Sequence, residues 1–302
     1  MSNGIVGDTK MFKGAITAIV TPFKEDESLD LDALKRLVEF QIKNKIDGIV
    51  PCGTTGESPT LDYEEHEKVI ETVIEAARGR TKIIAGTGSN STKEAIDMTR
   101  RAADAGADAS LQVSPYYNKP TQEGLFRHFS AIASSVDIPL IIYNIKGRTA
   151  VNIETQTLAR LQKEHSNIVA VKEASGDINQ MQDVLNTLPK SFDVLSGDDN
   201  MTFPLMKLGG RGVISVASNI IPGEVKKLTD YCLAKDFSKA EELHNKLMPL
   251  FKGIFIETNP IPIKAALAME GMIKESYRLP MCEMQKENRE KLKKVLEDLE
   301  II

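Results

Sequence analysis

Lys172 is the residue whose position most directly suggests covalent chemistry. It follows the apolar, largely β-branched run 168–171, which is typical of a buried parallel strand. In a strand, Ala170 lies on the same side as Lys172, and we expect Val169 and Val171 on the other side. The amine is then placed at the mouth of an apolar core. Because desolvation favours the neutral amine, Lys172 is suited to attack a carbonyl carbon and form a Schiff base.

Two ordinary explanations for Lys172 remain open on this segment alone. A lysine at a strand end can extend its amine to solvent while its methylene groups stay buried. It can also pair with the neighbouring carboxylate, here Glu173. The residues at the other strand ends decide between these two explanations and a role of Lys172 as a nucleophile.

Residues suited to a functional site, most of them with polar side chains, follow several other predicted strands. They are Thr54 and Thr55 after the second strand, Tyr116 and Tyr117 after the fourth, Tyr143 and Arg148 at the fifth, and Gly197 after the seventh. Each of these residues also has an ordinary structural explanation on its own, as part of a turn, as a tyrosine at the edge of the core or as a surface arginine. Together, hydroxyl groups, one amine and one guanidinium indicate carbonyl chemistry with proton shuttling and without a metal.

Strands and helices are expected to alternate along the chain. The hydrophobic pattern predicts strands at 15–20, 46–52, 82–85, 109–113, 139–143, 168–172, 192–195 and 212–216. It predicts helices at 32–45, 62–78, 91–105, 122–134, 153–163, 178–188, 202–208 and 222–234. Eight such units predict an α/β fold, a (β/α)₈ TIM barrel, rather than an open doubly wound sheet. In such a barrel the strand ends meet at one face, where working residues gather.

The chain continues beyond the predicted barrel. We assign residues 11–235 to the barrel and 236–302 to a C-terminal helical extension packed on it, with a proline-rich break at 259–262. No linker separates the two parts. We expect the extension to cover one face of the barrel or to build a contact between subunits.

The composition of the chain indicates which kinds of binding partner and site it favours. With 38 Lys and Arg against 43 Asp and Glu, the formal charge is −5, which disfavours nucleic acid and anionic membranes as partners. Three scattered cysteines and four scattered histidines suggest no disulfide framework and no metal site, and we expect no cofactor. Neither a signal peptide nor a membrane-spanning run is evident, so we expect a cytoplasmic protein. Residues 1–10 suggest no role.

Six motifs carry a resemblance to a known family. They are GTTGES at 53–58, YYNKP at 116–120, YN at 143–144 with RT at 148–149, VKEA at 171–174, SGDD at 196–199 and NPIP at 259–262. Together they resemble the dihydrodipicolinate synthase family, within the N-acetylneuraminate lyase superfamily of class I pyruvate-dependent aldolases. The similarity extends over nearly the whole chain from Met11.

The resemblance implies the condensation of pyruvate with L-aspartate 4-semialdehyde to 4-hydroxy-tetrahydrodipicolinate, a step of lysine and diaminopimelate biosynthesis. Lys172 would form the imine with pyruvate. Tyr143 would act as general acid and base, relaying protons through Thr54 and Tyr117. In the family, the residue matching Tyr117 reaches a neighbouring subunit's site, so the resemblance implies at least a homodimer, usually a tetramer built as a dimer of dimers.

The resemblance also assigns binding roles. Thr55, Gly197 and the backbone at Ile214 would hold pyruvate, and Arg148 would grip the carboxylate of the second substrate. One residue departs from the family pattern in the loop that carries Arg148: Lys146 replaces the usual proline. This replacement frees a backbone N–H donor and is expected to loosen the segment that holds Arg148.

Two rival functions remain. A related aldolase would use N-acetylneuraminate or a 2-keto-3-deoxy sugar acid, but such enzymes usually lack an arginine at the place of Arg148. A non-catalytic protein that binds a keto acid would have lost the amine, phenol or hydroxyl groups, and these are present here.

The family resemblance also suggests a regulatory pocket at a dimer interface for L-lysine. Five residues match that pocket: Ser58, His66, Asn90, Glu94 and Tyr116. Pro59 and Tyr63 differ from the pattern of the inhibited enzymes, and Tyr63 replaces a histidine. Glu94 can equally be explained as a residue that caps the start of its helix.

Overall fold

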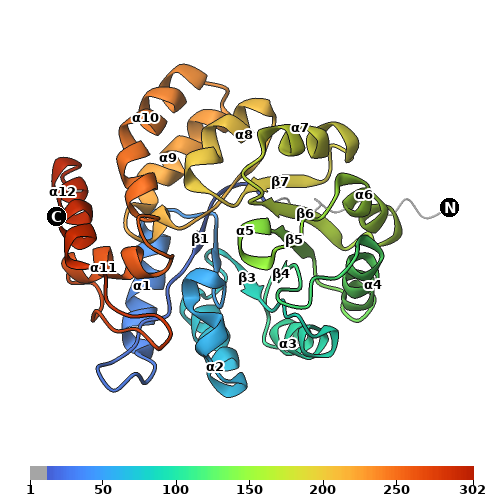
Figure 1. Cartoon of the computed structure of the whole chain (residues 1–302), viewed down its shortest axis with the longest axis horizontal. Coiled ribbons are helices and arrows are strands. Elements are labelled where there is room, and N and C mark those ends of the chain that lie inside the picture. The colour runs from blue at the N-terminus through green and yellow to red at the C-terminus, as the bar shows by residue number, and fades with distance from the viewer. Residues whose placement is uncertain (1–11) are drawn as a thin grey trace.

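In the computed structural model, which describes residues 12–302, eight parallel strands close into a barrel in the order β1 to β8 (Figure 1). Residues 1–11, which include the ten without an assigned role, lie outside the described part of the chain. The strands are β1 (Gly14–Ala18), β2 (Gly48–Val50), β3 (Lys82–Gly86), β4 (Ala109–Val113), β5 (Leu140–Asn144), β6 (Ile168–Glu173), β7 (Asp193–Ser196) and β8 (Gly212–Ser215). The predicted TIM barrel is confirmed.

Helices alternate with the strands and surround them. They are α1 (Leu31–Lys43), α2 (Tyr63–Ala77), α3 (Thr92–Asp104), α4 (Gln122–Ala133), α5 (Lys146–Thr149), α6 (Thr155–Glu164), α7 (Ile178–Thr187), α8 (Thr202–Leu208) and α9 (Pro222–Leu233). Short 3₁₀ turns are η1 (Thr54–Gly56), η2 (Ser58–Thr60), η3 (Asp199–Met201) and η4 (Ala217–Asn219). The predicted strands and helices correspond to these elements with ends shifted by a few residues.

The barrel closes where β1 pairs with β8, with Gly14 beside Gly212. A Cβ atom added to Gly212 would lie 2.1 Å from the carbonyl oxygen of Gly14. Such a contact is impossible for a side chain, so this seam requires glycine at position 212.

Side chains that point into the barrel form one apolar cluster. It contains Phe12, Ile16, Ala18, Val50, Ile84, Ala109, Leu111, Ile141, Tyr143, Ala170, Ala174, Leu195 and Ile214. Two larger clusters fill the space between the outer faces of the strands and the helices. Because interior and exterior residues alternate along each strand, Ala170 and Tyr143 share the interior with Lys172.

A β-bulge in β6 makes one part of this alternation irregular. Leu140 pairs with Ile168 but the next residue, Ile141, pairs with Ala170, which leaves Val169 as the extra residue. Val169 packs against the interior cluster, whereas Val171 belongs to an outer one. The prediction that these two valines share a face was therefore wrong.

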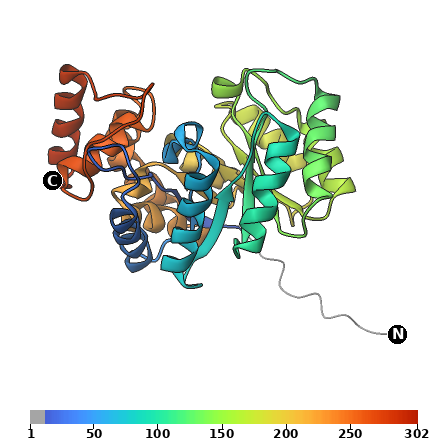
Figure 2. The same cartoon turned by 90° about the horizontal axis from the view of Figure 1, so that it is seen from below.

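The C-terminal extension comprises α10 (Phe237–Gly253), α11 (Ile261–Met269) and α12 (Lys286–Asp298). It protrudes on one side of the barrel, as Figure 2 shows. Apolar residues of α11 and α12, such as Ile263, Leu267 and Leu292, join the same core cluster as Leu34 and Val38 of α1. No helix within residues 12–302 is long and apolar enough to cross a membrane.

Candidate active site

Lys172 lies on β6 directly beside Tyr143 of β5, and both side chains are inside the barrel. The lysine is 6% exposed, and its Nζ lies 4.1 Å from the centre of the Tyr143 ring. Burial lowers the pKa of Lys172 to about 8, although the charges of Asp198 and Asp199 act in the opposite direction. A substantial fraction of the amine is therefore neutral near physiological pH, as a carbonyl nucleophile requires.

The ordinary explanations for Lys172 do not fit the structure. Glu173 points to the other side of β6, where it accepts hydrogen bonds from Asn144 Nδ2 at 3.2 Å and from the Ser175 N–H at 2.7 Å. The lysine therefore forms no pair with Glu173, and it is too deeply buried to extend to bulk water.

Tyr143 is placed as a proton donor rather than as a phenolate. Burial and the charge of Asp198 raise the pKa of Tyr143, opposed by the charge of Arg148 and a hydrogen bond with Thr54. Thr54 lies on η1, directly after β2, so two strand ends bring these hydroxyl groups together. The phenol is thus protonated at neutral pH, and Thr54 provides a hydroxyl group through which a proton can be relayed.

A cavity of ≈ 250 Å³ opens at the carboxyl ends of the strands. Its lining includes Thr54, Ser58, Tyr116, Tyr143, Arg148 and Lys172. Gly86 also lines the cavity, and its lack of a side chain allows the backbone of the neighbouring strand end to approach: an added Cβ would lie 2.4 Å from the Cys52 carbonyl oxygen. The volume suits small acids rather than large ligands.

Gly197 lies against the lysine from β7. A Cβ atom at this position would lie 2.5 Å from Cβ of Ala174 and 3.2 Å from Cε of Lys172. The absence of a side chain therefore leaves the lysine its space. Ile214 is fully buried in β8 with its side chain in the interior cluster, and neither residue is among those that line the cavity.

Arg148 lies on the single-turn helix α5 rather than in an irregular loop. The N–H groups of Thr149 and Ala150 donate to the carbonyls of Ile145 and Lys146. These hydrogen bonds hold the backbone that carries Arg148 in a regular turn, and the expectation that Lys146 loosens this segment stays a prediction. The guanidinium of Arg148 lines the cavity and donates to the Asn259 carbonyl at 3.0 Å.

Tyr117 is the one predicted relay residue that points away from its own cavity. It is 91% exposed and adopts a left-handed backbone conformation with φ of 72°. Tyr116, the preceding residue, lines the cavity instead. Within one chain, the structure therefore brings together Lys172, Tyr143 and Thr54 but not Tyr117.

Two residues near the site had no assigned role in the sequence. Asp198 places a charge close enough to act on both Lys172 and Tyr143. Asn259, from the C-terminal extension, donates from Nδ2 to Thr55 Oγ1 at 3.0 Å. Both residues belong to motifs that support the family resemblance. Those motifs were the signal by which the sequence could have identified them as site residues.

A buried ion pair supports the turn that carries the threonines. Glu57 follows η1 with φ of 52° and lies 2.5 Å from Nζ of Lys264, on α11. Both side chains are nearly inaccessible, and the amine also lies over the rings of Phe23 and Tyr277. The C-terminal extension thus fixes the end of the Thr54–Thr55 turn through a charged contact in an apolar setting.

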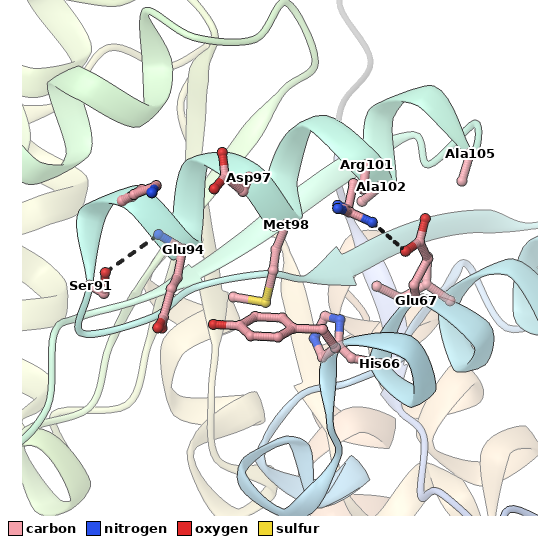
Figure 3. A pocket seen from close by; sticks show the side chains of 12 residues that line it. His66, Glu67, Ser91, Glu94, Asp97, Met98, Arg101, Ala102 and Ala105 are labelled. Carbon is pink, nitrogen blue, oxygen red and sulfur yellow. Dashed lines mark hydrogen bonds and ion pairs between the residues drawn. The ribbon is translucent and has the colours of Figure 1, made fainter.

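A second cavity, of ≈ 420 Å³, lies between α2 and α3 (Figure 3). Glu94 of α3 accepts a hydrogen bond from Ser89 Oγ at 2.8 Å, and it also bonds the phenol of Tyr63, whose pKa is raised by that contact. His66 of α2 lies in the same cavity, with its Nε2 2.9 Å from the Gly86 carbonyl oxygen.

The five residues that match the family's lysine pocket are thus divided. His66 and Glu94 lie in this second cavity, Ser58 and Tyr116 line the first, and Asn90 Nδ2 donates to the Tyr116 carbonyl at 3.1 Å. Glu94 does not complete a reciprocal capping box: its backbone N–H donates to Ser91 Oγ, while its carboxylate is bonded to Ser89 and Tyr63. Its side chain is therefore available to this cavity rather than to the helix end.

Among residues 12–302, no group of three or more His, Cys, Asp or Glu side chains could hold a metal ion.

The chain is similar to known proteins both in sequence and in structure. The model of the dihydrodipicolinate synthetase family matches residues 11–299. The 4-hydroxy-tetrahydrodipicolinate synthase of Syntrophus aciditrophicus is 57% identical over 97% of this chain and 100% of its own length.

Solved structures agree with the sequence matches. The dihydrodipicolinate synthase of Aquifex aeolicus has a TM-score of 0.95 and 52% identity, over 96% of this chain and 99% of its own. The Acinetobacter baumannii enzyme complexed with pyruvate has a TM-score of 0.95 and 46% identity over 97% and 100%. The Cyanidioschyzon merolae enzyme with lysine bound has a TM-score of 0.94 and 39% identity over 96% and 99%.

Proposed function

This chain belongs to the dihydrodipicolinate synthetase family, and from that premise we propose that it condenses pyruvate with L-aspartate 4-semialdehyde. The product is 4-hydroxy-tetrahydrodipicolinate, a precursor of diaminopimelate and lysine, and the enzyme is a lyase that works through a Schiff base. The observation that carries this proposal is the buried Lys172 amine, with a pKa of about 8, beside the protonated phenol of Tyr143.

The first half of the reaction forms the imine. The neutral amine of Lys172 attacks the keto carbon of pyruvate, and the keto oxygen leaves as water once it has been protonated. Tyr143 donates to that oxygen and is reprotonated through Thr54. Gly197 leaves space for the lysine chain, and Thr55 receives the pyruvate carboxylate beside the backbone at Ile214.

The second half forms the carbon–carbon bond. A methyl proton passes to the relay of Tyr143 and Thr54, which converts the imine into an enamine. The enamine carbon then attacks the aldehyde of the semialdehyde. The new alkoxide takes a proton from Tyr143. The amino group of the condensed product then attacks the imine carbon, which closes the ring and releases Lys172 as a free amine.

Arg148 favours the semialdehyde over a sugar aldehyde as second substrate. Its guanidinium lines the cavity and is oriented by the Asn259 carbonyl, so a forked donor is available for a carboxylate. We expect Arg148→Ala to raise the KM for aspartate semialdehyde while pyruvate still forms its imine. No observation favours the sugar-acid aldolases, and all of the reactive groups that a non-catalytic relative would lack are present.

Reductive trapping tests the central step. The protein is incubated with pyruvate and sodium borohydride, digested, and mapped by mass spectrometry. We expect one pyruvate-derived adduct on the peptide that carries Lys172 and none in the Lys172→Arg variant. An adduct on another lysine, or none at all, would disprove the assignment.

A subunit contact completes the relay in this proposal. Tyr117 is exposed and turned away from its own cavity, so we propose that its phenol enters the site of a second copy. The smallest active unit is then a homodimer, and the assembly is a tetramer built as a dimer of dimers. A relative described as a monomeric variant shows that assembly varies in this family.

We propose that the cavity between α2 and α3 is where L-lysine regulates the enzyme. His66 and Glu94 line it, Ser58, Asn90 and Tyr116 lie toward the active site, and one solved relative has lysine bound. Because Tyr63 is bonded to Glu94, the phenol competes with an incoming amine for that carboxylate.

Calorimetry with L-lysine tests the regulatory proposal. Binding heat and slower turnover are expected at millimolar lysine, and Tyr63→Phe should bind lysine more tightly because Glu94 loses a competing donor. No heat together with an unchanged rate would remove lysine as a ligand of this cavity.

A further inference from the structure

Asn259 contacts both of the residues that are expected to hold substrate carboxylates. Its side-chain Nδ2 donates to Thr55 Oγ1 at 3.0 Å, and its backbone carbonyl accepts from Arg148 Nη2 at 3.0 Å. The residue is only 4% exposed, and 204 positions separate it from Thr55. It comes from the C-terminal extension and not from any barrel strand.

The direction of the Thr55 contact determines what the hydroxyl can do next. A hydroxyl group carries one proton and can accept on its lone pairs. Because Asn259 donates to Thr55 Oγ1, the threonine proton is free to be donated to another group. A carboxylate only accepts hydrogen bonds, so a threonine prepared in this way is matched to the pyruvate carboxylate.

The backbone around Asn259 is held in place by hydrogen bonds on both sides of it. Next to it, the N–H of Ile261 donates to the Thr258 carbonyl, and the N–H of Lys264 donates to the Pro260 carbonyl. The side chain of Lys264 is in turn locked to Glu57, which follows the threonine turn. Asn259 and Thr55 are therefore fixed relative to each other from both sides.

We propose that Asn259 is a positioning residue with two separate functions. Its side chain holds the Thr55 hydroxyl as a donor for pyruvate, and its backbone carbonyl orients Arg148 for the second substrate. The inference rests on the proposed function, since it assigns a purpose to contacts within that site. It predicts that a change of the side chain alone affects one substrate and not the other.

Two substitutions separate the direction of the hydrogen bond from its presence. Asn259→Ala removes the donor, and we expect the KM for pyruvate to rise about tenfold, as for loss of one hydrogen bond in a buried site. Asn259→Asp keeps the shape but replaces the donor by an acceptor. Its carboxylate would accept a hydrogen bond from the Thr55 hydroxyl and repel the pyruvate carboxylate, so we expect a rise of about a hundredfold.

The Asp variant offers a second readout. Protonation of the introduced carboxyl restores a donor, so its excess defect over Asn259→Ala should shrink as the pH is lowered. In Asn259→Ala the KM for aspartate semialdehyde should stay within about twofold of the original, because the backbone carbonyl that holds Arg148 remains.

A double-mutant cycle localises the effect to Thr55. In a Thr55→Val background, Asn259→Ala should change the KM for pyruvate little further, because the partner hydroxyl is already absent. Asn288→Ala is the matched control: this asparagine also lies in the C-terminal extension and makes one side-chain hydrogen bond, to Glu257 Oε1 at 2.8 Å. It should leave both KM values unchanged.

Several results would overturn the proposal. Equal rises in both KM values would mean that the variant merely loosens the site, and additive effects of Thr55→Val and Asn259→Ala would mean that the two residues act independently. An Asp variant as active as Asn259→Ala would show that the direction of the bond is irrelevant. If the proposed function itself fails, the unmodified protein gives no condensation and no trapped imine, which is a different outcome.

Discussion

At the scale of single residues, the burial of the Lys172 amine lowers the free energy of unfolding. The folded protein holds this group in the barrel interior, and burial lowers its pKa from 10.5 to about 8. Between these values the unfolded chain binds more protons than the folded one, so folding stability rises with pH in that window and the penalty is fully present below pH 8.

This penalty predicts a more stable but inactive variant. Lys172→Met keeps the length of the side chain and removes the charge, so we expect the free energy of unfolding at pH 7 to rise by about 2 kcal/mol. Urea denaturation should show this gain shrinking as the pH is raised from 8 toward 10.5. A variant that is less stable than the original at pH 7 would contradict this account of the lysine.

The same pKa predicts the pH dependence of the first step. Because the neutral amine attacks, kcat/KM for pyruvate should rise with pH and level off above about 8. The charge of Asp198 raises the pKa of Lys172, so Asp198→Asn should move the inflection to lower pH. An inflection that stays in place would show that another group is titrating.

Residues at strand ends could be predicted from the sequence. Lys172, Tyr143 and Thr54 could be placed together because strand positions in a barrel determine which side chains meet at one face. The contact between Thr55 and Asn259 could not be predicted in this way, because it depends on how the extension folds back over the barrel. The outward direction of Tyr117 depends on a left-handed backbone that its residue type does not favour.

At the scale of the elements, β6 and β7 fit closely where they carry the site. Gly197 begins the β7 loop, and its backbone packs on Ala174 and on the side chain of Lys172. The bulge at Val169 could not be predicted from the alternation of side chains along β6. Strict alternation places Val169 on the outer face, but as the extra residue of the bulge it packs against the interior cluster.

The close fit predicts a strong effect from one methyl group. In Gly197→Ala, the new Cβ would clash with Ala174 and crowd Cε of Lys172, so the amine must shift. We expect kcat to fall about a hundredfold, as is common when a reacting group is displaced by about an ångström. Gly147→Ala is the control, because no atom lies within 4 Å of its added Cβ. Steady-state kinetics would distinguish the two variants.

The ion pair between α11 and the threonine turn predicts a large change in stability. Lys264→Met leaves the Glu57 carboxylate buried without its counter-charge, so we expect a loss of about 3 kcal/mol in urea denaturation. The double variant with Glu57→Gln should recover much of that loss, because neither charge then remains. A double variant as unstable as the single one would contradict this interpretation.

At the scale of the whole molecule, the barrel and the extension share one core and one site. The alternation of strands and helices predicted the barrel because each unit repeats the same pattern, and repetition makes errors in single elements harmless. It did not predict how the extension reaches the cavity. Helices α11 and α12 are amphipathic or apolar, and such patterns show that a face is buried without showing against what.

A mixing experiment tests whether subunits share their residues. If Tyr117 serves a neighbour's site, Lys172→Ala and Tyr117→Phe should each be nearly inactive alone. After unfolding and refolding together, mixed dimers would contain one complete site, so roughly a quarter of the original activity should return. Refolded mixtures with no gain in activity would mean that Tyr117 serves its own subunit's site, and a Tyr117→Phe variant that is active alone would place Tyr117 outside the reaction.

The return of the extension to the mouth of the barrel constrains how such enzymes can be recombined. A chimera that joined the first 235 residues of this protein to the tail of a distant homologue would keep its amine and its phenol. It would nevertheless depend on the foreign tail for the partners of Thr55, Glu57 and Arg148. Successful exchanges should therefore transplant the threonine turn, the arginine helix and the tail as one block, however far apart they are in the gene.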